Sequence, residues 1–217
     1  MSTLKVGLVL VAAVAGTISA TAYAADDDFN PWEVRARFLR LDSKAQSDPI
    51  PGLGLPADAV NVHSKNFPEV DISYFFTKNI AAELILTYPQ KMNVSIDGVG
   101  IGPIGHVSAL PPTLTGQYHF NLTPAFDPYV GAGVNFTWLT NVDLVVPGAP
   151  QLNLTTSRTS FGGAFQIGAD YKVYKNWVLN ADVKYAWISY DLKSNGTTVS
   201  TLKVDPWLLG AGIGYKF

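Results

Sequence analysis

The sequence predicts an all-β protein, an eight-stranded antiparallel β-barrel that spans a membrane. Three observations predict this fold. Apolar and polar residues alternate along eight stretches, and a period of two is that of a β-strand. The connections between these stretches are alternately short and long, as in membrane barrels. The chain after residue 24 has no run of about 18 apolar residues that could form a spanning helix, although the mean hydropathy of the full 217-residue sequence is positive, at +0.15.

Residues 1–24 are expected to be a secretory signal peptide, and residues 25–217 the barrel. Lys5 precedes an apolar run over 6–15, and Ala22-Tyr23-Ala24 forms a small-x-small cleavage site. An uncleaved membrane anchor is the alternative, for which the apolar run is short. Cleavage of the signal peptide would remove Lys5 and leave 14 of the 15 basic residues against 17 acidic residues. This charge balance gives no indication of nucleic-acid binding. Cysteine is absent, which excludes thiol chemistry and cysteine-ligated metals.

The first four strands are expected over 32–41, 67–76, 80–88 and 112–120. In each of them one set of alternate residues is apolar, and the other set holds the charged and polar residues. A tight turn at 77–79 joins the second strand to the third. The apolar sets include Trp32, Val34, Ala36 and Phe38, then Val70, Ile72 and Tyr74, then Ile80, Ala82, Leu84 and Leu86, and finally Leu114, Gly116, Tyr118 and Phe120.

The last four strands are expected over 129–138, 160–171, 177–187 and 207–217. Trp177 and Trp187 share one face of the seventh strand, at a spacing of about 25 Å along the membrane normal for a tilted strand. This spacing fits two interfacial aromatic girdles. In the last strand the face opposite the apolar one carries Gly210, Gly212 and Gly214. A face almost without side chains fits the crowded interior of a narrow barrel.

The connections give the barrel an orientation. The short ones are 77–79, 121–127 and 172–176, and the long ones are 42–65, 89–111, 139–156 and 189–201. Short turns face the periplasm and long loops face outward in such barrels, so both termini are expected in the periplasm. A soluble ligand-binding barrel of the lipocalin kind is the alternative architecture. It would place apolar residues inside, whereas here most of the ionisable residues in the strands lie opposite the apolar face.

The inward-facing positions fall into two sets by height. Near the periplasmic end and the middle they are mostly charged, and opposite charges in a narrow barrel must pair, because an unpaired buried charge is very costly. These residues are expected to form a structural plug: Glu33, Arg35, Arg37, Asp71, Glu83, Asp170, Asp182, Lys184 and Lys216. Near the outer end the inward positions are apolar, which suits a hydrophobic guest or simple core packing. This expected ligand channel comprises Leu39, Leu41, Phe67, Ile85, Ile188 and Leu208.

Prolines mark a possible exit from that channel. Proline has no N–H group to donate, so it weakens a strand ladder. Because the plug blocks the lower lumen, a hydrophobic guest would leave sideways into the bilayer, through a break in the wall. The alternative is that these prolines only end strands. The expected lateral opening comprises Pro68, Pro89, Leu110, Pro111, Pro112 and Leu114.

Three motifs resemble the outer membrane protein W (OmpW) family. They are the stretch 110–118, the stretch 128–135, and Asp205-Pro206-Trp207 with the terminal Gly214-Tyr215-Lys216-Phe217. The resemblance implies a monomeric barrel in the bacterial outer membrane, surrounded by its lipids. It also implies passage of small hydrophobic molecules, with alkane uptake in some members. It further implies that the strand ending at Phe217 is recognised by the outer-membrane insertion machinery.

Other functions fit the sequence less well. An enzyme would need a nucleophile held near a base, and no spacing among His106, Ser108 and His119 enforces that. The three histidines are scattered, so no zinc site is expected. A structural or adhesive barrel would favour a lumen that is polar along its full height and long hydrophilic loops. The sequence therefore predicts a non-enzymatic channel for hydrophobic molecules, without a metal or cofactor and without a nucleic-acid partner.

Overall fold

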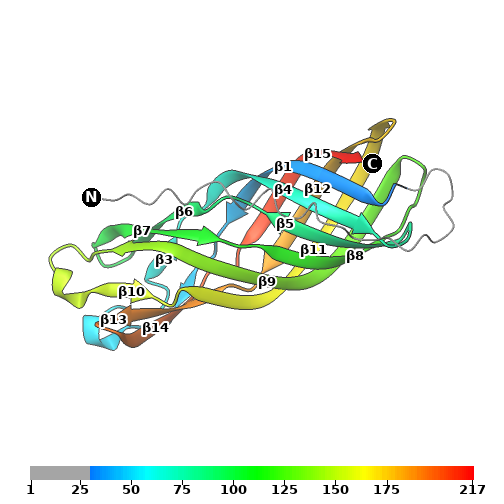
Figure 1. Ribbon diagram of the computed structural model, residues 1–217. Helices are drawn as coiled ribbons and strands as arrows, with labels where there is room; N and C mark the ends of the chain where they lie inside the picture. Colours follow the sequence, from blue (N-terminus) through cyan, green and yellow to red (C-terminus); the bar gives the residue numbers. More distant parts are fainter. Residues whose placement is uncertain (1–29) are drawn as a thin grey trace, which may run out of the picture.

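A closed ring of antiparallel strands forms one half of the molecule (Figure 1). The computed structural model describes residues 30–217, and the predicted signal peptide lies outside them. Eight strands follow one another around the ring, and the last pairs with the first. The predicted barrel is therefore confirmed. The eight are β1 (Trp32–Asp42), β4 (Lys65–Phe75), β5 (Ile80–Leu86), β8 (Thr113–His119), β9 (Phe126–Leu144), β11 (Thr159–Tyr174), β12 (Trp177–Ala186) and β15 (Trp207–Lys216).

Alternation places the apolar side chains on the outside of this ring and the charged ones inside. Trp177 and Trp187 are both about half exposed on the outer surface, at 44% and 50%. Trp177 packs on Tyr215 at one end of the barrel, with ring centroids 5.0 Å apart, and Tyr185 packs on Trp207 at the other end, also at 5.0 Å. The two aromatic girdles expected from the spacing of the tryptophans are therefore present.

The glycines of β15 give space to inward-facing side chains. A Cβ atom added to Gly210 would lie 2.5 Å from the Asp182 carboxylate and 2.6 Å from Leu39. A Cβ atom on Gly214 would lie 2.7 Å from the Glu33 carboxylate. The bare face of the last strand is thus the surface against which the charged residues of the lumen pack.

We expect Gly210→Val to destabilise the barrel by about 1–3 kcal/mol, since overpacking forces neighbouring side chains out of their rotamers. The shift of the urea unfolding midpoint in lipid vesicles measures this effect. Ala211→Val is the matched control, because Ala211 is the next residue of the same strand and faces outward. Equal midpoints for the two variants would contradict close packing at Gly210.

The four long connections are not irregular loops, which corrects the sequence-based expectation. Strand β9 continues to Leu144, beyond the barrel. Alternate residues such as Met92, Val94 and Ile96 are buried, so a strand period was present within stretches that are also rich in Gly and Pro. The further elements are β2 (Gln46–Ser47), η1 (Pro51–Leu53), β3 (Val60–Val62), β6 (Gln90–Ile96), β7 (Gly102–Leu110), η2 (Pro150–Leu152), β10 (Leu154–Thr156), β13 (Ser189–Ser194) and β14 (Thr197–Lys203).

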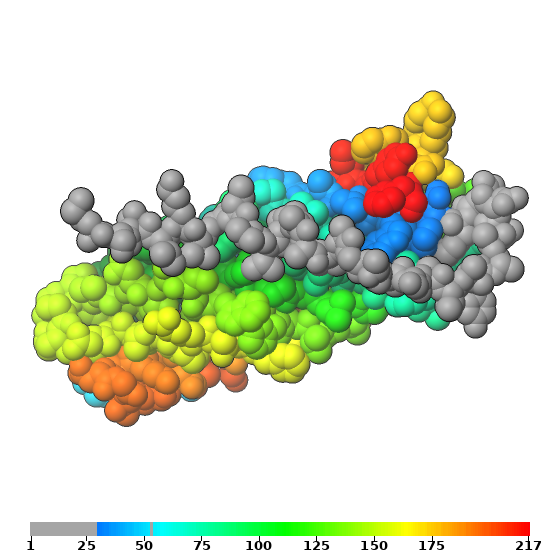
Figure 2. Space-filling model, in the orientation of Figure 1, coloured from blue at the N-terminus to red at the C-terminus, as the bar shows by residue number. Residues whose placement is uncertain are grey.

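These elements form an extension at one end of the barrel. Strands β7, β6 and β3 continue the barrel sheet beside the upper part of β9, while β10, β13, β14 and β2 form a separate four-stranded sheet. Apolar residues of both sheets pack into one core. Figure 2 shows the result as an elongated molecule, with the extension at one end and the C-terminus near the other. In the described part of the chain, neither short 3-10 helix approaches the length or apolar character needed to cross a membrane.

Candidate functional site

Arg35 on β1 lies at the centre of the lower lumen. Its side chain has no exposed surface, and its guanidinium contacts three carboxylates from three directions. The nitrogen–oxygen distances are 2.9 Å to Glu33, 2.6 Å to Glu83 on β5, and 2.7 Å to Asp170 on β11. Because β1 and β11 are not neighbours, the last contact crosses the lumen. Arg35 therefore ties together strands that share no backbone ladder.

Arg37 forms a second ionic layer two residues along β1. Its guanidinium lies 2.5 Å from Asp71, 2.7 Å from Asp182 and 3.0 Å from Glu69. Lys184 completes this layer by pairing with Glu69 and, at 3.4 Å, with Asp182. The ion pairs expected of the two arginines are thus formed.

The lumen also contains members that the sequence-based list of plug residues omitted. Glu69 is one, although it shares the inward parity of Phe67 and Asp71 on β4. Tyr129 is another: its ring lies 5.5 Å from the Arg35 guanidinium, and its hydroxyl accepts a hydrogen bond from Asn180. Tyr129 alternates with the outward-facing residues of β9, so its inward position could have been predicted from the sequence. Lys216 is the most peripheral member, 3.5 Å from Glu33 and partly exposed.

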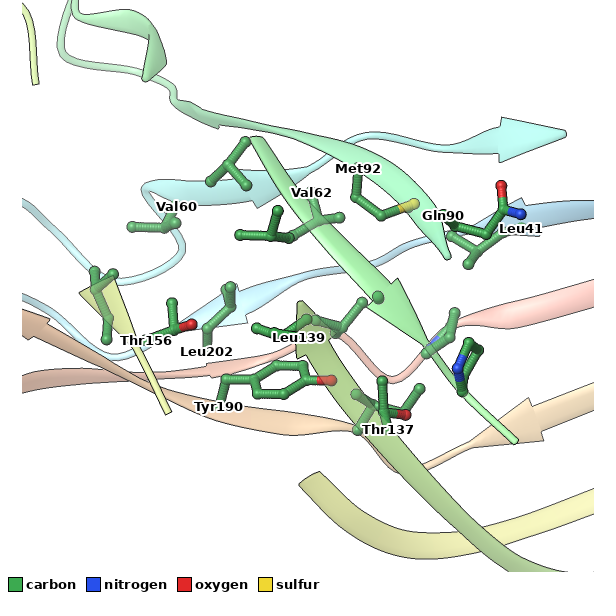
Figure 3. Close-up of a pocket in the computed structure, with 18 of the residues that line it drawn as sticks. Leu41, Val60, Val62, Gln90, Met92, Thr137, Leu139, Thr156, Tyr190 and Leu202 are labelled. Atoms are coloured by element: carbon green, nitrogen blue, oxygen red, sulfur yellow. The ribbon is translucent and has the colours of Figure 1, made fainter. Parts of the chain in front are cut away.

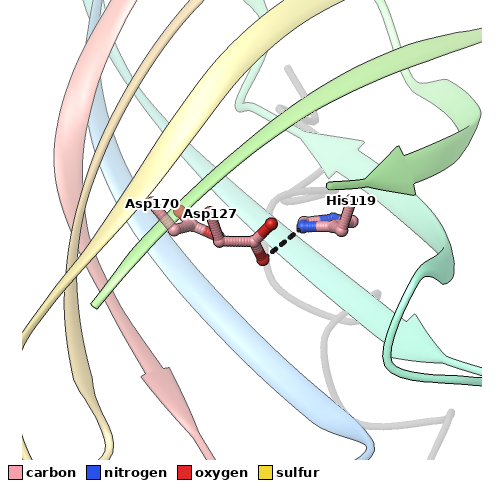
Figure 4. A group of neighbouring side chains, drawn as sticks. All are labelled: His119, Asp127 and Asp170. Carbon is pink, nitrogen blue, oxygen red and sulfur yellow. Dashed lines mark hydrogen bonds and ion pairs between the residues drawn. The ribbon is translucent and has the colours of Figure 1, made fainter. Parts of the chain in front are cut away.

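One group at the lower end has the residue types of a metal site. Ligand atoms of His119, Asp127 and Asp170 lie within 4.8 Å of one another (Figure 4). The His119 Nδ1 atom is 2.8 Å from Asp127, and its Nε2 atom is 3.1 Å from the Gln117 side-chain oxygen. Asp170 is held by Arg35. Since protein partners engage these donor atoms, we assign the group to the base of the plug.

The plug separates two hollows. A cavity above it, of about 50 Å³, includes Glu69 and Lys184 in its lining, and these residues belong to the upper ionic layer. A wide hollow at the opposite end of the barrel, of about 670 Å³, reaches Asp170 and Lys216 on the lower side. The two arginine layers fill the space between them. The barrel is therefore not an open pore in this structure.

A second upper cavity, of about 70 Å³, lies in the extension (Figure 3). It shares Leu41, Phe67, Ile188 and two prolines with the cavity above the plug, so the two cavities are adjacent. Of the other residues expected in the ligand channel, Ile85 and Leu208 line the lower of the two cavities. Leu39 is fully buried but lines neither cavity, since it lies against Gly210. Much of the cavity wall comes from the extension, including Val60, Val62, Met92, Leu139 and Leu202, which the sequence-based list of channel residues omitted.

The barrel wall has an interrupted ladder beside these cavities. The β4–β5 ladder ends at Val70 and Leu86, and β4 residues 65–69 pair only with β1 among the described strands. The β5–β8 ladder ends at Ile85 and Thr113, and the β6–β7 ladder begins at Gln90 and Ala109. Residues 86–89 and 110–112 between them form no ladder pairs with each other. We call the stretch of wall formed by residues 65–69, 86–89 and 110–112 the seam.

The prolines expected at a lateral opening lie along the seam. Pro68 is in the part of β4 that β5 leaves unpaired, and Pro89, Pro111 and Pro112 separate β5 from β6 and β7 from β8. A side-chain bond crosses the seam, because the Thr87 hydroxyl donates to the Pro68 carbonyl at 3.1 Å. Leu110 is half-buried at the end of β7. Leu114 is exposed and pairs with Leu84, so it belongs to the intact wall below.

Comparison with known proteins agrees with this architecture. The model of the OmpW family matches residues 32–217. The uncharacterised outer-membrane protein y4mB of Sinorhizobium fredii is 40% identical over 87% of this chain and 80% of its own length. Outer membrane protein W of Vibrio cholerae is 34% identical over 72% of this chain and 76% of its own. The crystal structure of OprG from Pseudomonas aeruginosa superposes with a TM-score of 0.74 at 27% identity, and covers 88% of this chain and 97% of that one. The chain is thus an outer-membrane β-barrel protein and belongs to the OmpW family.

Proposed function

We propose that this protein is a passive uptake channel for small hydrophobic molecules, which bind in the upper cavities and leave through the seam into the membrane. One observation carries the proposal. The apolar cavities are closed below by paired charges and bordered on one side by a wall without a continuous ladder. A guest that enters from the extension meets ionic groups below it and an interrupted wall beside it.

The energetics of the two routes differ strongly. A hydrocarbon that entered the plug would separate paired charges and offer them no new partners, which is unfavourable. Transfer into the bilayer gains about 0.8 kcal/mol for each CH₂ group kept from water. The lower cavity reaches the seam directly, because Thr87 and Pro111 line it together with Phe67 and Ile85. The sideways route is therefore the favourable one.

The proposal also fixes an orientation and a set of partners. The extension faces outward, and the short turns face the periplasm. The start of the first strand and the end of the last strand lie on the periplasmic side too, where Trp32 and Phe217 exchange backbone hydrogen bonds. The partners are outer-membrane lipids and the hydrophobic guest, and the insertion machinery acts on the last strand. We propose a monomer without catalytic activity.

A disulfide across the seam tests the exit route. The β4–β5 register, continued beyond Val70 and Leu86, places Pro68 opposite Tyr88. The native chain has no cysteine, so Pro68→Cys with Tyr88→Cys introduces the only thiols. We expect the oxidised variant to take up n-octane and toluene at least several-fold more slowly than the reduced one, because the seam can no longer widen. Uptake is measured in cells that carry the variant in place of the native protein.

Ile72→Cys with Leu84→Cys is the matched control, since these residues form an outward-facing pair on the same two strands where the ladder is intact. Oxidation of this pair should leave uptake unchanged. A second lock, between cysteines at Pro89 and Pro111, closes the β5–β8 side of the seam. If neither lock slows uptake, the guest leaves the barrel elsewhere.

A further inference from the structure

The cavity in the extension has an unusual chemical composition. Its lining is mostly aliphatic, and none of the described residues that line it is charged. It nevertheless contains Gln90, Thr156 and Tyr190, each of which is at least nine-tenths buried. A cavity that only accommodates hydrocarbon chains needs no such groups. Figure 3 shows the three side chains on the wall of the cavity.

Each of these side chains presents a polar atom without a protein partner. The Tyr190 hydroxyl, the Thr156 hydroxyl and the Gln90 side-chain oxygen have no hydrogen-bond partner among the described residues. A buried polar atom without a hydrogen-bond partner is destabilising, so most such atoms are satisfied by protein, water or ligand. Three such atoms around one cavity indicate that its occupant completes their hydrogen bonds.

The orientation of the Gln90 amide follows from its neighbours. Its nitrogen lies 3.0 Å from the Tyr88 carbonyl oxygen and 3.2 Å from the Thr87 hydroxyl. A carbonyl can only accept, so the nitrogen must be on this side, and the oxygen is left as the free acceptor. Gln90 therefore offers an acceptor at the end of the cavity next to the seam.

Tyr190 offers the complementary group. Its hydroxyl can donate, and burial raises the pKa of this phenol. Tyr190 thus stays a donor throughout the physiological range. The proton of the Thr137 hydroxyl is already donated to Asn135, at 2.6 Å, so Thr137 does not donate to Tyr190.

We infer that the extension cavity selects uncharged amphiphiles, that is, aliphatic or monocyclic molecules that carry one hydroxyl or carbonyl group, and that Tyr190, Gln90 and Thr156 are the specificity-determining residues. This inference rests on the proposed function and deepens it. A hydroxyl or carbonyl oxygen accepts from Tyr190, whereas a hydroxyl at the other end of the cavity donates to Gln90 (Figure 3). Carboxylates and amines are excluded, because no opposite charge on the lining would offset their desolvation.

Binding of matched ligands to the purified protein in nanodiscs tests the inference. The probes are n-octane, 1-octanol, 2-octanone and octanoate, which share one chain length and differ in their polar group. We expect 1-octanol and 2-octanone to bind more tightly than n-octane once each affinity is corrected for partition into the lipid, and octanoate to bind least. Tyr190→Phe should weaken 1-octanol and 2-octanone binding roughly 2- to 10-fold, the value of one net hydrogen bond, and leave n-octane unchanged.

Two further variants and a control complete the experiment. Gln90→Met should weaken 1-octanol more than 2-octanone, since only the alcohol donates, and Thr156→Val removes the third hydroxyl without changing the side-chain shape. Tyr118→Phe is the matched control, because this tyrosine is half-exposed on the outer surface of the barrel. Native-like heat-modified migration confirms that each variant is folded.

The outcomes separate this inference from the proposed function. If n-octane and 1-octanol bind equally and Tyr190→Phe changes neither, the inference is overturned and water is the occupant, even where uptake through the seam persists. If the probes discriminate as expected while uptake is independent of the protein, the cavity selects amphiphiles and the channel proposal fails.

Discussion

Replacing Arg35 by alanine is expected to lower the free energy of unfolding by about 3–5 kcal/mol, the usual cost of removing one partner from a buried ionic group. The loss is large because Glu33, Glu83 and Asp170 would remain buried around an empty space. Arg37→Ala should have a similar effect through the second layer. The midpoint of urea unfolding in lipid vesicles measures the change. Conductance in planar bilayers should rise in the double variant, since both layers of the plug are then open.

Arg40→Ala is the control for this prediction, because it removes the same charge from the same strand at an exposed position. A second comparison adds Glu83→Gln to Arg35→Ala. The double variant should be less destabilised than the sum of the single effects, since the neutral amide no longer needs a cation. Unchanged stability and unchanged conductance in the Arg35→Ala, Arg37→Ala protein would show that the charges do not close the barrel.

Deletion of Phe217 is expected to leave a periplasmic, protease-sensitive product in place of a folded barrel. Phe217 exchanges backbone hydrogen bonds with Trp32, at 2.9 and 3.2 Å, so it contributes to the pairing of the last strand with the first. Its side chain is exposed beside Tyr215, with ring centroids 6.1 Å apart, and is therefore accessible to a factor that recognises the end of the chain. Fractionation of the cell envelope, with heat-modified migration as the test of folding, gives the result.

Two variants distinguish recognition from loss of an aromatic group. Phe120→Ala removes an exposed aromatic residue from another strand end, and we expect normal insertion. Phe217→Tyr keeps the aromatic end and should also insert. A heat-modifiable barrel in the outer membrane after deletion of Phe217 would mean that the last residue carries no insertion signal.

The barrel could be predicted from the sequence because its two environments differ so sharply. A side chain on β1 faces either lipid or the lumen, so Phe38 and Arg37 cannot exchange places, and strict alternation results. The terminal glycines were informative for the same reason. The sorting of inward residues by height followed from strand direction, and it placed Arg35 and Arg37 below Phe67 and Leu41 without any knowledge of contacts.

The extension could not be predicted in the same way. Its strands are short and belong to two sheets that enclose one small apolar core. Glycines with positive φ, such as Gly98 and Gly102, interrupt the alternation between and within these strands. Which carboxylate pairs with which arginine depends on the stagger of the barrel, which brings Asp170 to Arg35 across the lumen. The role of Gln90 depends on an amide orientation that only its neighbours reveal. These features arise from long-range register, which a single sequence does not express.

Strand β9 has a length that matters for where a guest is first met. Its 19 residues correspond to about 60 Å of extended chain, or roughly 45 Å of height at a tilt near 40°. The hydrocarbon band of such a barrel is only about 25 Å tall. The upper part of β9 therefore stands clear of the lipid, in the hydrated layer where oily molecules are scarcely soluble and diffuse slowly. The cavity in the extension therefore shortens the aqueous distance that such a molecule must cross before it reaches an apolar surface.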